Sequence, residues 1–189
     1  MAKITLNPMF DELHGKFGDI VYRESYGNLL MSRNPKMKGV VPSARQLAQR
    51  ERFRQAAVYA QAAFAEEPVR QLYAPIADQR LKPILAVMIA DFLHGPSIDE
   101  LDVSHYEGRI GSPIYVWARD DFAVQTVQVK IVDSNGELRE SGFAAVEPGV
   151  ERWKYMGQMD LPSGISLCIQ VLVTDRPGNM ASKEAAKTV

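Results

Sequence analysis

The sequence predicts an α+β fold in two domains, a small β-hairpin with α-helices over residues 1–95 and an all-β sandwich over residues 96–189. The first part has apolar residues at helical spacing, whereas the second part changes to alternating strands separated by turn residues. The clearest strand lies at residues 165–174, where odd positions are apolar and even positions are mostly polar or small. Residues 175–179, Asp-Arg-Pro-Gly-Asn, then end it with side chains that favour turns.

The N-terminal part begins with a predicted β-hairpin. Residues 17–23 and 28–33 are rich in aromatic and β-branched side chains, and a Gly-Asn pair between them favours a turn. An isolated hairpin is only marginally stable in water, so this one is expected to pack against another element. Residues 34–41 follow as a basic loop.

Two helices are expected between the hairpin and the sandwich. Ser43 and Gln46 have the spacing of a capping box, which predicts a helix from there to about Glu66, and Pro68 prevents its simple continuation. A short helical turn is expected just after that proline. The second helix is predicted over residues 84–93 and is apolar nearly all round. The apolar stripe of the first helix consists of Phe53, Ala57, Ala60 and Phe64, with Ala56 and Ala63 beside it.

The sandwich is expected to contain seven strands separated by turns. They lie near residues 99–105, 113–119, 124–133, 137–145, 152–159, 164–174 and 180–186. In the third strand, Val127, Val129 and Ile131 are predicted to face inward. Trp153 and Tyr155 are predicted to fill the centre of the sandwich, where truncation of a fully buried Trp153 to alanine would cost about 3–5 kcal/mol.

Four stretches of the second half together resemble bacterial immunoglobulin-like domains. They are WARDDFAV at residues 117–124, DSNG at 133–136, WKY at 153–155 and VTDRPGN at 173–179. The resemblance covers roughly residues 97–186 and implies an immunoglobulin-like sandwich. As a guide to function it says little, because this fold hosts many unrelated roles.

The first half resembles a family of uncharacterised bacterial and phage-associated proteins. The matching residues are GKFGDIVYR at 15–23, QLAQRERF at 46–53 and ADFL at 90–93. The resemblance carries over no catalytic residue, and it implies a structural or assembly role.

The composition is that of a soluble globular protein, with 46% hydrophobic and 24% charged residues. The longest apolar run, residues 83–90, is far shorter than the ~20 residues that span a bilayer. The first ten residues lack the apolar core of a signal peptide, and the single Cys168 cannot form an internal disulfide. We therefore expect a cytoplasmic protein, free or within a phage-like particle, without a membrane partner.

The sequence contains no nucleophile elbow, phosphate loop or dinucleotide fingerprint, so the protein is predicted not to be an enzyme and to need no cofactor. His14, His94 and His105 are isolated in the sequence and are expected to be surface or boundary residues. Cys168 lies on the polar face of its strand without a basic neighbour, and it is expected to be unreactive.

One end of the predicted sandwich collects acidic and amide side chains. Asp120 and Asp121 lie in the loop after the second strand, and Asp175 and Asn179 follow the sixth strand at the same end. Converging oxygen ligands of this kind could hold Ca²⁺, so these four residues are the candidate metal ligands. The preferred alternative is that Asp175 and Asn179 hydrogen-bond the backbone of their own turn, because no spacing matches a dedicated calcium loop.

Charge is unevenly distributed along the chain. Residues 1–54 carry ten Lys/Arg against five Asp/Glu, a net charge of +5, and the remainder carries −6. Opposite charges on two parts of one chain favour head-to-tail association. We therefore predict a non-enzymatic structural protein that self-associates as a homo-oligomer or filament. Its predicted interface consists of apolar hairpin residues and basic helix residues, namely Tyr22, Tyr26, Leu29, Met31, Arg50, Arg52 and Arg54.

Two alternatives remain open at this point. The hairpin can fold back on its own helices and leave the charges solvated, or the sandwich loops can present a binding site for a carbohydrate or another protein. Nucleic acid is not expected as a partner, because the Lys/Arg patch has no aromatic platform or reading motif beside it.

Overall fold

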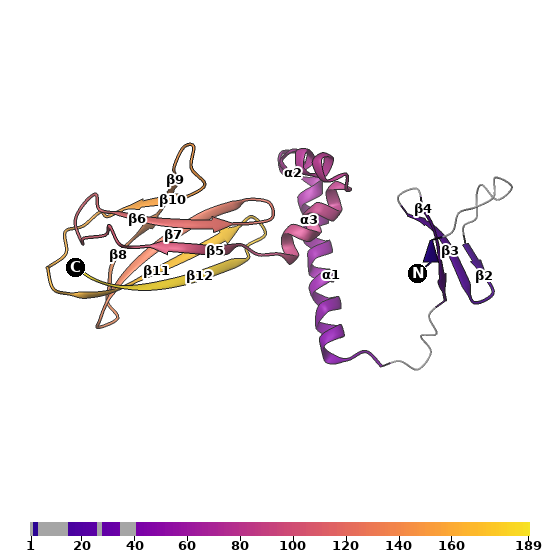
Figure 1. Cartoon of the computed structure of the whole chain (residues 1–189), viewed down its shortest axis with the longest axis horizontal. Helices are drawn as coiled ribbons and strands as arrows, with labels where there is room; N and C mark the ends of the chain where they lie inside the picture. Colours follow the sequence, from indigo (N-terminus) through magenta and orange to yellow (C-terminus); the bar gives the residue numbers. More distant parts are fainter. Residues whose placement is uncertain (1, 4–14, 26–27, 35–40) are drawn as a thin grey trace. The chain divides into compact units, whose positions relative to one another are not determined.

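A computed structural model describes residues 2–3, 15–25, 28–34 and 41–189 of the chain (Figure 1). Its contacts divide the chain into two compact units, Met1–Ala44 and Arg45–Val189. This division differs from the predicted boundary after residue 95. The helices belong with the C-terminal sheets because they pack against loops at one end of those sheets, where Phe122 joins the helical core.

The first unit contains a small antiparallel sheet with the strand order β1-β4-β3-β2. Within the described residues its strands are β1 (Ala2–Lys3), β2 (Gly15–Phe17), β3 (Ile20–Ser25) and β4 (Asn28–Arg33). The predicted run 17–23 is divided between two strands, because Gly18 adopts a φ of +58° and turns the chain between β2 and β3. In the predicted hairpin Tyr22 pairs with Met31, while Tyr26 lies outside the described residues.

Three α-helices follow in the described chain, α1 (Ala44–Ala65), α2 (Glu67–Arg80) and α3 (Ile84–Leu93). Their shared core is formed by six buried side chains, namely Ala60, Ala63, Tyr73, Ala77, Val87 and Met88. The apolar stripe of α1 differs from the predicted one, because Ala56 is fully buried whereas Phe53 is 51% exposed. Three buried alanines, Ala56, Ala60 and Ala63, therefore line the packed face of α1, and Tyr59 and Phe64 pack beside them against the core.

Helix α2 is much longer than the single turn predicted after Pro68. That proline lies in the first turn of α2, where a backbone N–H has no helical partner and its loss costs nothing. The helix continues through Pro75 and stops at Leu81, whose left-handed backbone (φ 50°) lets its N–H bond the carbonyls of the last turn. The two prolines are the reason that the sequence pattern concealed this helix.

Residues 97–189 form two antiparallel sheets of four strands each (Figure 1). The first sheet has the order β5-β6-β10-β9 and the second has the order β12-β11-β7-β8. The strands are β5 (Ser97–Asp102), β6 (Pro113–Arg119), β7 (Val124–Asp133), β8 (Leu138–Phe143), β9 (Ala145–Val146), β10 (Trp153–Met156), β11 (Ser166–Asp175) and β12 (Met180–Thr188). All seven predicted strands are overlapped by observed ones, and the predicted run 137–145 reaches from β8 to the first residue of β9.

The inner faces of the two sheets share one hydrophobic core. Val127, Val129 and Ile131 of β7 are fully buried, as their alternation with polar residues predicted. On β10, Tyr155 is buried but Trp153 is only partly buried and packs at the margin of the core. The prediction that both aromatic rings fill the centre is therefore correct for Tyr155 alone.

One carboxylate is buried beside this core. Glu140 of β8 is 5% exposed, and its Oε1 accepts hydrogen bonds from the Tyr155 hydroxyl (2.5 Å) and the Gln158 backbone N–H (2.6 Å). The Tyr106 hydroxyl lies 3.5 Å from its Oε2. Burial, together with the adjacent carboxylate, raises the pKa of both tyrosines. The charge of Glu140 is thus surrounded by donors.

Candidate metal centre

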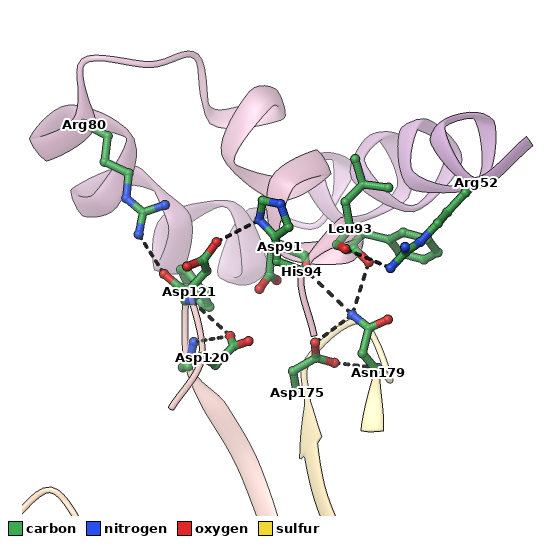
Figure 2. Close-up of polar contacts among 12 residues, drawn as sticks. Arg52, Arg80, Asp91, Leu93, His94, Asp120, Asp121, Asp175 and Asn179 are labelled. Atoms are coloured by element: carbon green, nitrogen blue, oxygen red, sulfur yellow. Dashed lines mark hydrogen bonds and ion pairs between the residues drawn. The ribbon is translucent and has the colours of Figure 1, made fainter. Parts of the chain in front are cut away.

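The helices meet the sheets at the loop between β6 and β7 and at the turn between β11 and β12 (Figure 2). The ring of Tyr73 stacks on Phe122 of the β6–β7 loop, with centroids 4.1 Å apart. The side chain of Asn179, in the β11–β12 turn, donates to the Phe92 carbonyl (3.2 Å), and Arg80 Nη2 donates to the Asp121 carbonyl (2.8 Å). These contacts hold α2 against the β6–β7 loop and the end of α3 against the β11–β12 turn.

Asp175 ends β11 and organises the turn that follows. Its Oδ1 accepts hydrogen bonds from the backbone N–H groups of Gly178 (2.9 Å) and Asn179 (2.6 Å), and its Oδ2 accepts from Asn179 Nδ2 (2.7 Å). Asp175 and Asn179 thus hydrogen-bond within their own turn, as the preferred alternative from the sequence predicted. The carboxylate is held rigidly and is only 2% exposed.

Asp120 organises the β6–β7 loop in a similar way. Its Oδ2 accepts hydrogen bonds from the backbone N–H groups of Phe122 and Ala123, both at 3.0 Å. Its Oδ1 is buried and has no hydrogen-bond partner among the residues that the structure describes. The loop therefore fixes Oδ2 of Asp120, whereas Oδ1 is available to a further ligand.

The third carboxylate comes from α3. Asp91 is 2% exposed, and its Oδ2 accepts a hydrogen bond of 2.5 Å from the Tyr73 hydroxyl, which also contacts the Tyr59 hydroxyl at 3.0 Å. Asp91 Oδ1 is buried and, within the described parts of the chain, lacks a hydrogen-bond partner. Burial raises the pKa of Tyr73, and the carboxylate beside it acts in the same direction.

Asp91, Asp120 and Asp175 converge on one point. One oxygen from each carboxylate lies within 4.8 Å of the corresponding oxygens of the other two. Burial raises the pKa of Asp91 from 3.8 to about 6, and the charges of Asp120 and Asp175 add to this rise, against the opposing effects of Tyr73 and Arg176. Three negative groups at this spacing require a positive counter-charge, which a proton, an arginine or a metal ion can supply.

The structure brings together two of the four predicted ligands and adds one that the sequence reasoning missed. Asp121 turns away, because its carboxylate contacts His94 Nδ1 at 2.8 Å near the surface. Asn179 serves as a hydrogen-bond donor to α3 and to Asp175. The missed residue is Asp91, and the signal that could have found it is its position as the single charged residue in the apolar helix 84–93.

His105 and Cys168 lie apart from this cluster. The His105 ring packs edge-on against Tyr115, with centroids 6.2 Å apart, and His14 lies outside the described residues. Burial raises the pKa of the Cys168 thiol, and Glu184 beside it adds to that effect. A raised pKa lowers the thiolate fraction, in keeping with the unreactive thiol expected from the sequence.

The predicted interface residues occupy two elements. In the first unit Tyr22, Leu29 and Met31 are partly buried. On α1 the three arginines are exposed, but two of them have partners: Arg54 pairs with Glu51, and Arg52 Nη2 donates to the Leu93 carbonyl at 2.8 Å. Arg52 therefore connects α1 to α3 as well as carrying charge.

Comparison with known proteins gives little to set beside this geometry. No protein-family model matches the chain, and no curated protein matches it. A solved structure that resembles it is CopC from Methylosinus trichosporium OB3b, which is 16% identical. The match covers 49% of this chain and 91% of that chain, with a TM-score of 0.36. Among the described residues, no helix is long and apolar enough to cross a membrane.

Proposed function

We propose that this protein is a non-catalytic structural protein that assembles with further copies of itself through the first three turns of α1. The observation that carries the proposal is the exposure of this segment: every residue from 44 to 55 is exposed to solvent. Two large apolar side chains lie in it, Leu47 at 53% and Phe53 at 51% exposure. The second half of α1 packs against α2 and α3, whereas the first half does not share their core.

The exposed half of α1 would be more stable if another protein surface packed against it. A helical stretch of about a dozen residues is marginal in water without tertiary packing. Full burial of a Leu or Phe side chain contributes about 1.5–3 kcal/mol each. A surface that accepts both Leu47 and Phe53 would therefore stabilise the helix and the contact together.

A second copy of the chain offers a surface of the opposite charge. Residues 97–189 contain nine Lys/Arg and fourteen Asp/Glu, a net charge of −5. The exposed half of α1 contributes Arg45 and Arg50 in addition to the partnered Arg52 and Arg54. Opposite charge steers and orients the encounter, and the apolar side chains hold it. Because helix and sheets are different surfaces, the contact is heterologous and builds rings or filaments.

The first unit supplies a further edge for assembly in this proposal. Strand β2 lies at the end of its sheet, all three of its residues are exposed, and Phe17 is 79% exposed. A strand of another copy can extend such an edge, and Tyr22, Leu29 and Met31 lie on the neighbouring strands. The setting that we propose is a phage or phage-like particle, as the resemblance of the first half suggests.

The fold that we assign to residues 97–189 is immunoglobulin-like. The strand orders β5-β6-β10-β9 and β12-β11-β7-β8 support this assignment. They correspond to the ABED and GFC sheets of such domains, with β8 added at the edge next to β7. This fold hosts many unrelated roles, so it is compatible with a structural role but does not define it.

The test is the mass of the purified full chain in solution, measured by mass photometry and light scattering at low salt. We expect regular assemblies for the natural protein and monomers for the double variant Leu47→Gln, Phe53→Gln. The matched control is Val58→Gln, which removes an equally exposed apolar side chain (57%) from the other half of the same helix. A natural protein that stays monomeric at high concentration and low salt refutes the proposal.

A second candidate function is a binding module for carbohydrate, and one observation favours it. Arg152 lies over the rings of Tyr115 (4.2 Å) and Trp117 (5.8 Å) on the outer face of β6. Trp117 also lines an open hollow of ≈ 320 Å³, together with Asp99, Arg119 and Glu151. Aromatic rings next to charged groups suit a sugar. Loss of glycan binding in Trp117→Ala, with monomers throughout, would favour this function over assembly.

A further inference from the structure

Three carboxylates lie close together where the helices meet the sheets, and two of their buried oxygens have no hydrogen-bond partner among the described residues. Asp91, Asp120 and Asp175 come from α3, from the β6–β7 loop and from the end of β11 (Figure 2). We propose that these three aspartates bind a hard divalent cation, with Ca²⁺ as the first candidate. The site joins the helices to the two sheets and is independent of the assembly surface on α1.

The first argument is the two buried oxygens that have no partner. Asp91 Oδ1 and Asp120 Oδ1 are shielded from solvent, and no group in the described residues donates a hydrogen bond to either. Asp91 as a whole is 2% exposed, so water does not satisfy its charge from outside. A buried carboxylate oxygen without a donor is costly, and coordination to a cation removes that cost.

The second argument is the spacing. Carboxylate oxygens bind Ca²⁺ at about 2.3–2.6 Å, so ligands of one ion lie at most about 5 Å from each other. The three aspartate oxygens lie within 4.8 Å of one another. A single ion between them can therefore reach all three without a large movement of the backbone. The ligand set consists of oxygens alone, which favours a hard cation over zinc or copper.

The third argument is that each carboxylate is already oriented by hydrogen bonds to its other lone pairs. Tyr73 holds Oδ2 of Asp91, two backbone N–H groups hold Oδ2 of Asp120, and the β11–β12 turn holds Asp175. Among the described residues Asp175 Oδ2 accepts one hydrogen bond, from Asn179, and it retains a lone pair for a metal. Partners that fix the ligands in this way are a general feature of metal sites.

The fourth argument is charge. Arg176 lies close enough to oppose the charge of Asp91, but its buried Nε donates to no acceptor among the described residues. Three carboxylates and one guanidinium leave a net charge of about −2 at neutral pH. A divalent cation balances that charge. Because its ligands come from three separate elements, the ion would exist only in the folded state and would stabilise it.

The experiment uses the full chain, freed of metal with EDTA and then titrated with CaCl₂ while thermal unfolding is followed. We expect the melting temperature to rise by about 5–10 °C at a hundredfold excess of Ca²⁺ over its Kd. In parallel, TbCl₃ should give luminescence sensitised by Tyr73, which is hydrogen-bonded to a ligand, and added Ca²⁺ should remove it. This second readout needs no variant and so does not depend on whether a variant folds.

The matched variants are neighbours in the sequence. Asp120→Asn should abolish both responses, whereas Asp121→Asn should retain both, because the Asp121 carboxylate contacts His94 instead. The proposal is overturned if the natural protein shows neither response. The proposal is also overturned if Asp120→Asn responds to Ca²⁺ and Tb³⁺ as the natural protein does. A third outcome overturns it as well: Asp120→Asn melts at a higher temperature than the calcium-loaded natural protein, because Arg176 alone would then suffice as the counter-charge.

Discussion

Glu140 and Asp91 are both carboxylates at most 5% exposed, yet their surroundings are opposite in character. Glu140 lies against the core of the two sheets and accepts from the Tyr155 hydroxyl and the Gln158 N–H, with the Tyr106 hydroxyl near its other oxygen. In the part of the chain that the structure describes, Asp91 accepts from one hydroxyl, that of Tyr73, and lies close to two further carboxylates. The two carboxylates are therefore alike in burial and differ in the number of hydrogen-bond donors around them.

The two sites also differ in how they are connected to the fold. Glu140, on β8 of one sheet, is joined to the facing sheet, since Tyr155 lies on β10 and Gln158 is in the loop that follows that strand. Asp91 joins helices to loops, across the boundary that the sequence placed between two domains. Removal of Glu140 should therefore destabilise the sheets, whereas changes at Asp91 should alter how a ligand or a proton is bound.

The largest effect is expected for Glu140→Ala. The substitution leaves two hydroxyls and one backbone N–H without their acceptor in a buried place, which should lower the free energy of unfolding by about 3–5 kcal/mol. Chemical unfolding followed by tryptophan fluorescence measures it. The matched control is Glu137→Ala, whose side chain is 65% exposed in the same β7–β8 hairpin, with a change within about 0.5 kcal/mol. If Glu140→Ala and Glu137→Ala lower the free energy of unfolding equally, the donors around Glu140 do not stabilise the fold as this comparison assumes.

A smaller effect should distinguish the two tyrosines that face Glu140. Tyr155→Phe deletes a 2.5 Å hydrogen bond to the carboxylate and should cost about 2 kcal/mol. Tyr106→Phe deletes a contact of 3.5 Å, at the limit of a hydrogen bond, and should cost under about 1 kcal/mol. Both rings remain buried, so hydrophobic burial is matched between the variants. If Tyr106→Phe lowers the free energy of unfolding more than Tyr155→Phe does, the ranking of the two hydroxyls by their distance from Glu140 is wrong.

Much of the fold was predictable because strand patterns depend on local alternation. The alternation on β7 and β11 predicted which residues face inward, and Tyr155 lies in the core as expected. Trp153 follows the same alternation as Tyr155, but it is the first residue of β10 and is only partly buried against the core. Truncation of Trp153 to alanine should therefore cost less than the ~3–5 kcal/mol expected for a fully buried tryptophan. Alternation gives the direction of a side chain and does not give the depth of packing above it.

The residues of the candidate site were predictable only where a single loop or turn determines the position of the side chain. Asp120 and Asp175 were found because each organises a turn at the same end of the sheets. Which of two consecutive aspartates points inward depends on the loop conformation, so the sequence did not show that Asp121 turns toward His94. Asp91 could not be placed without knowing that α3 ends over those loops, a contact between segments more than eighty residues apart in the sequence.

The smallest of the three effects concerns pH and separates Asp91 from Glu140 directly. Burial and the charges of Asp120 and Asp175 raise the pKa of Asp91 in the folded protein to about 6, from 3.8. A carboxyl group whose pKa is raised on folding contributes stability below its unfolded pKa, and that contribution is lost as pH rises through the folded pKa. In EDTA the protein should therefore be more stable at pH 5 than at pH 7.5, by about 1 kcal/mol from this group.

Asp91→Asn is the variant that isolates this contribution, because its amide oxygen can still accept from Tyr73 while the titrating proton is gone. We expect the difference between pH 5 and pH 7.5 in urea midpoint to shrink by the same amount in this variant. Arg176 and the two remaining aspartates are unchanged in it, so their own pH dependence cancels in the comparison. The control Asp121→Asn should keep the full difference, since Asp121 is paired with His94 and lies outside the cluster. An unchanged pH difference in Asp91→Asn would mean that the three carboxylates are neutralised in the folded protein by a group other than a proton on Asp91.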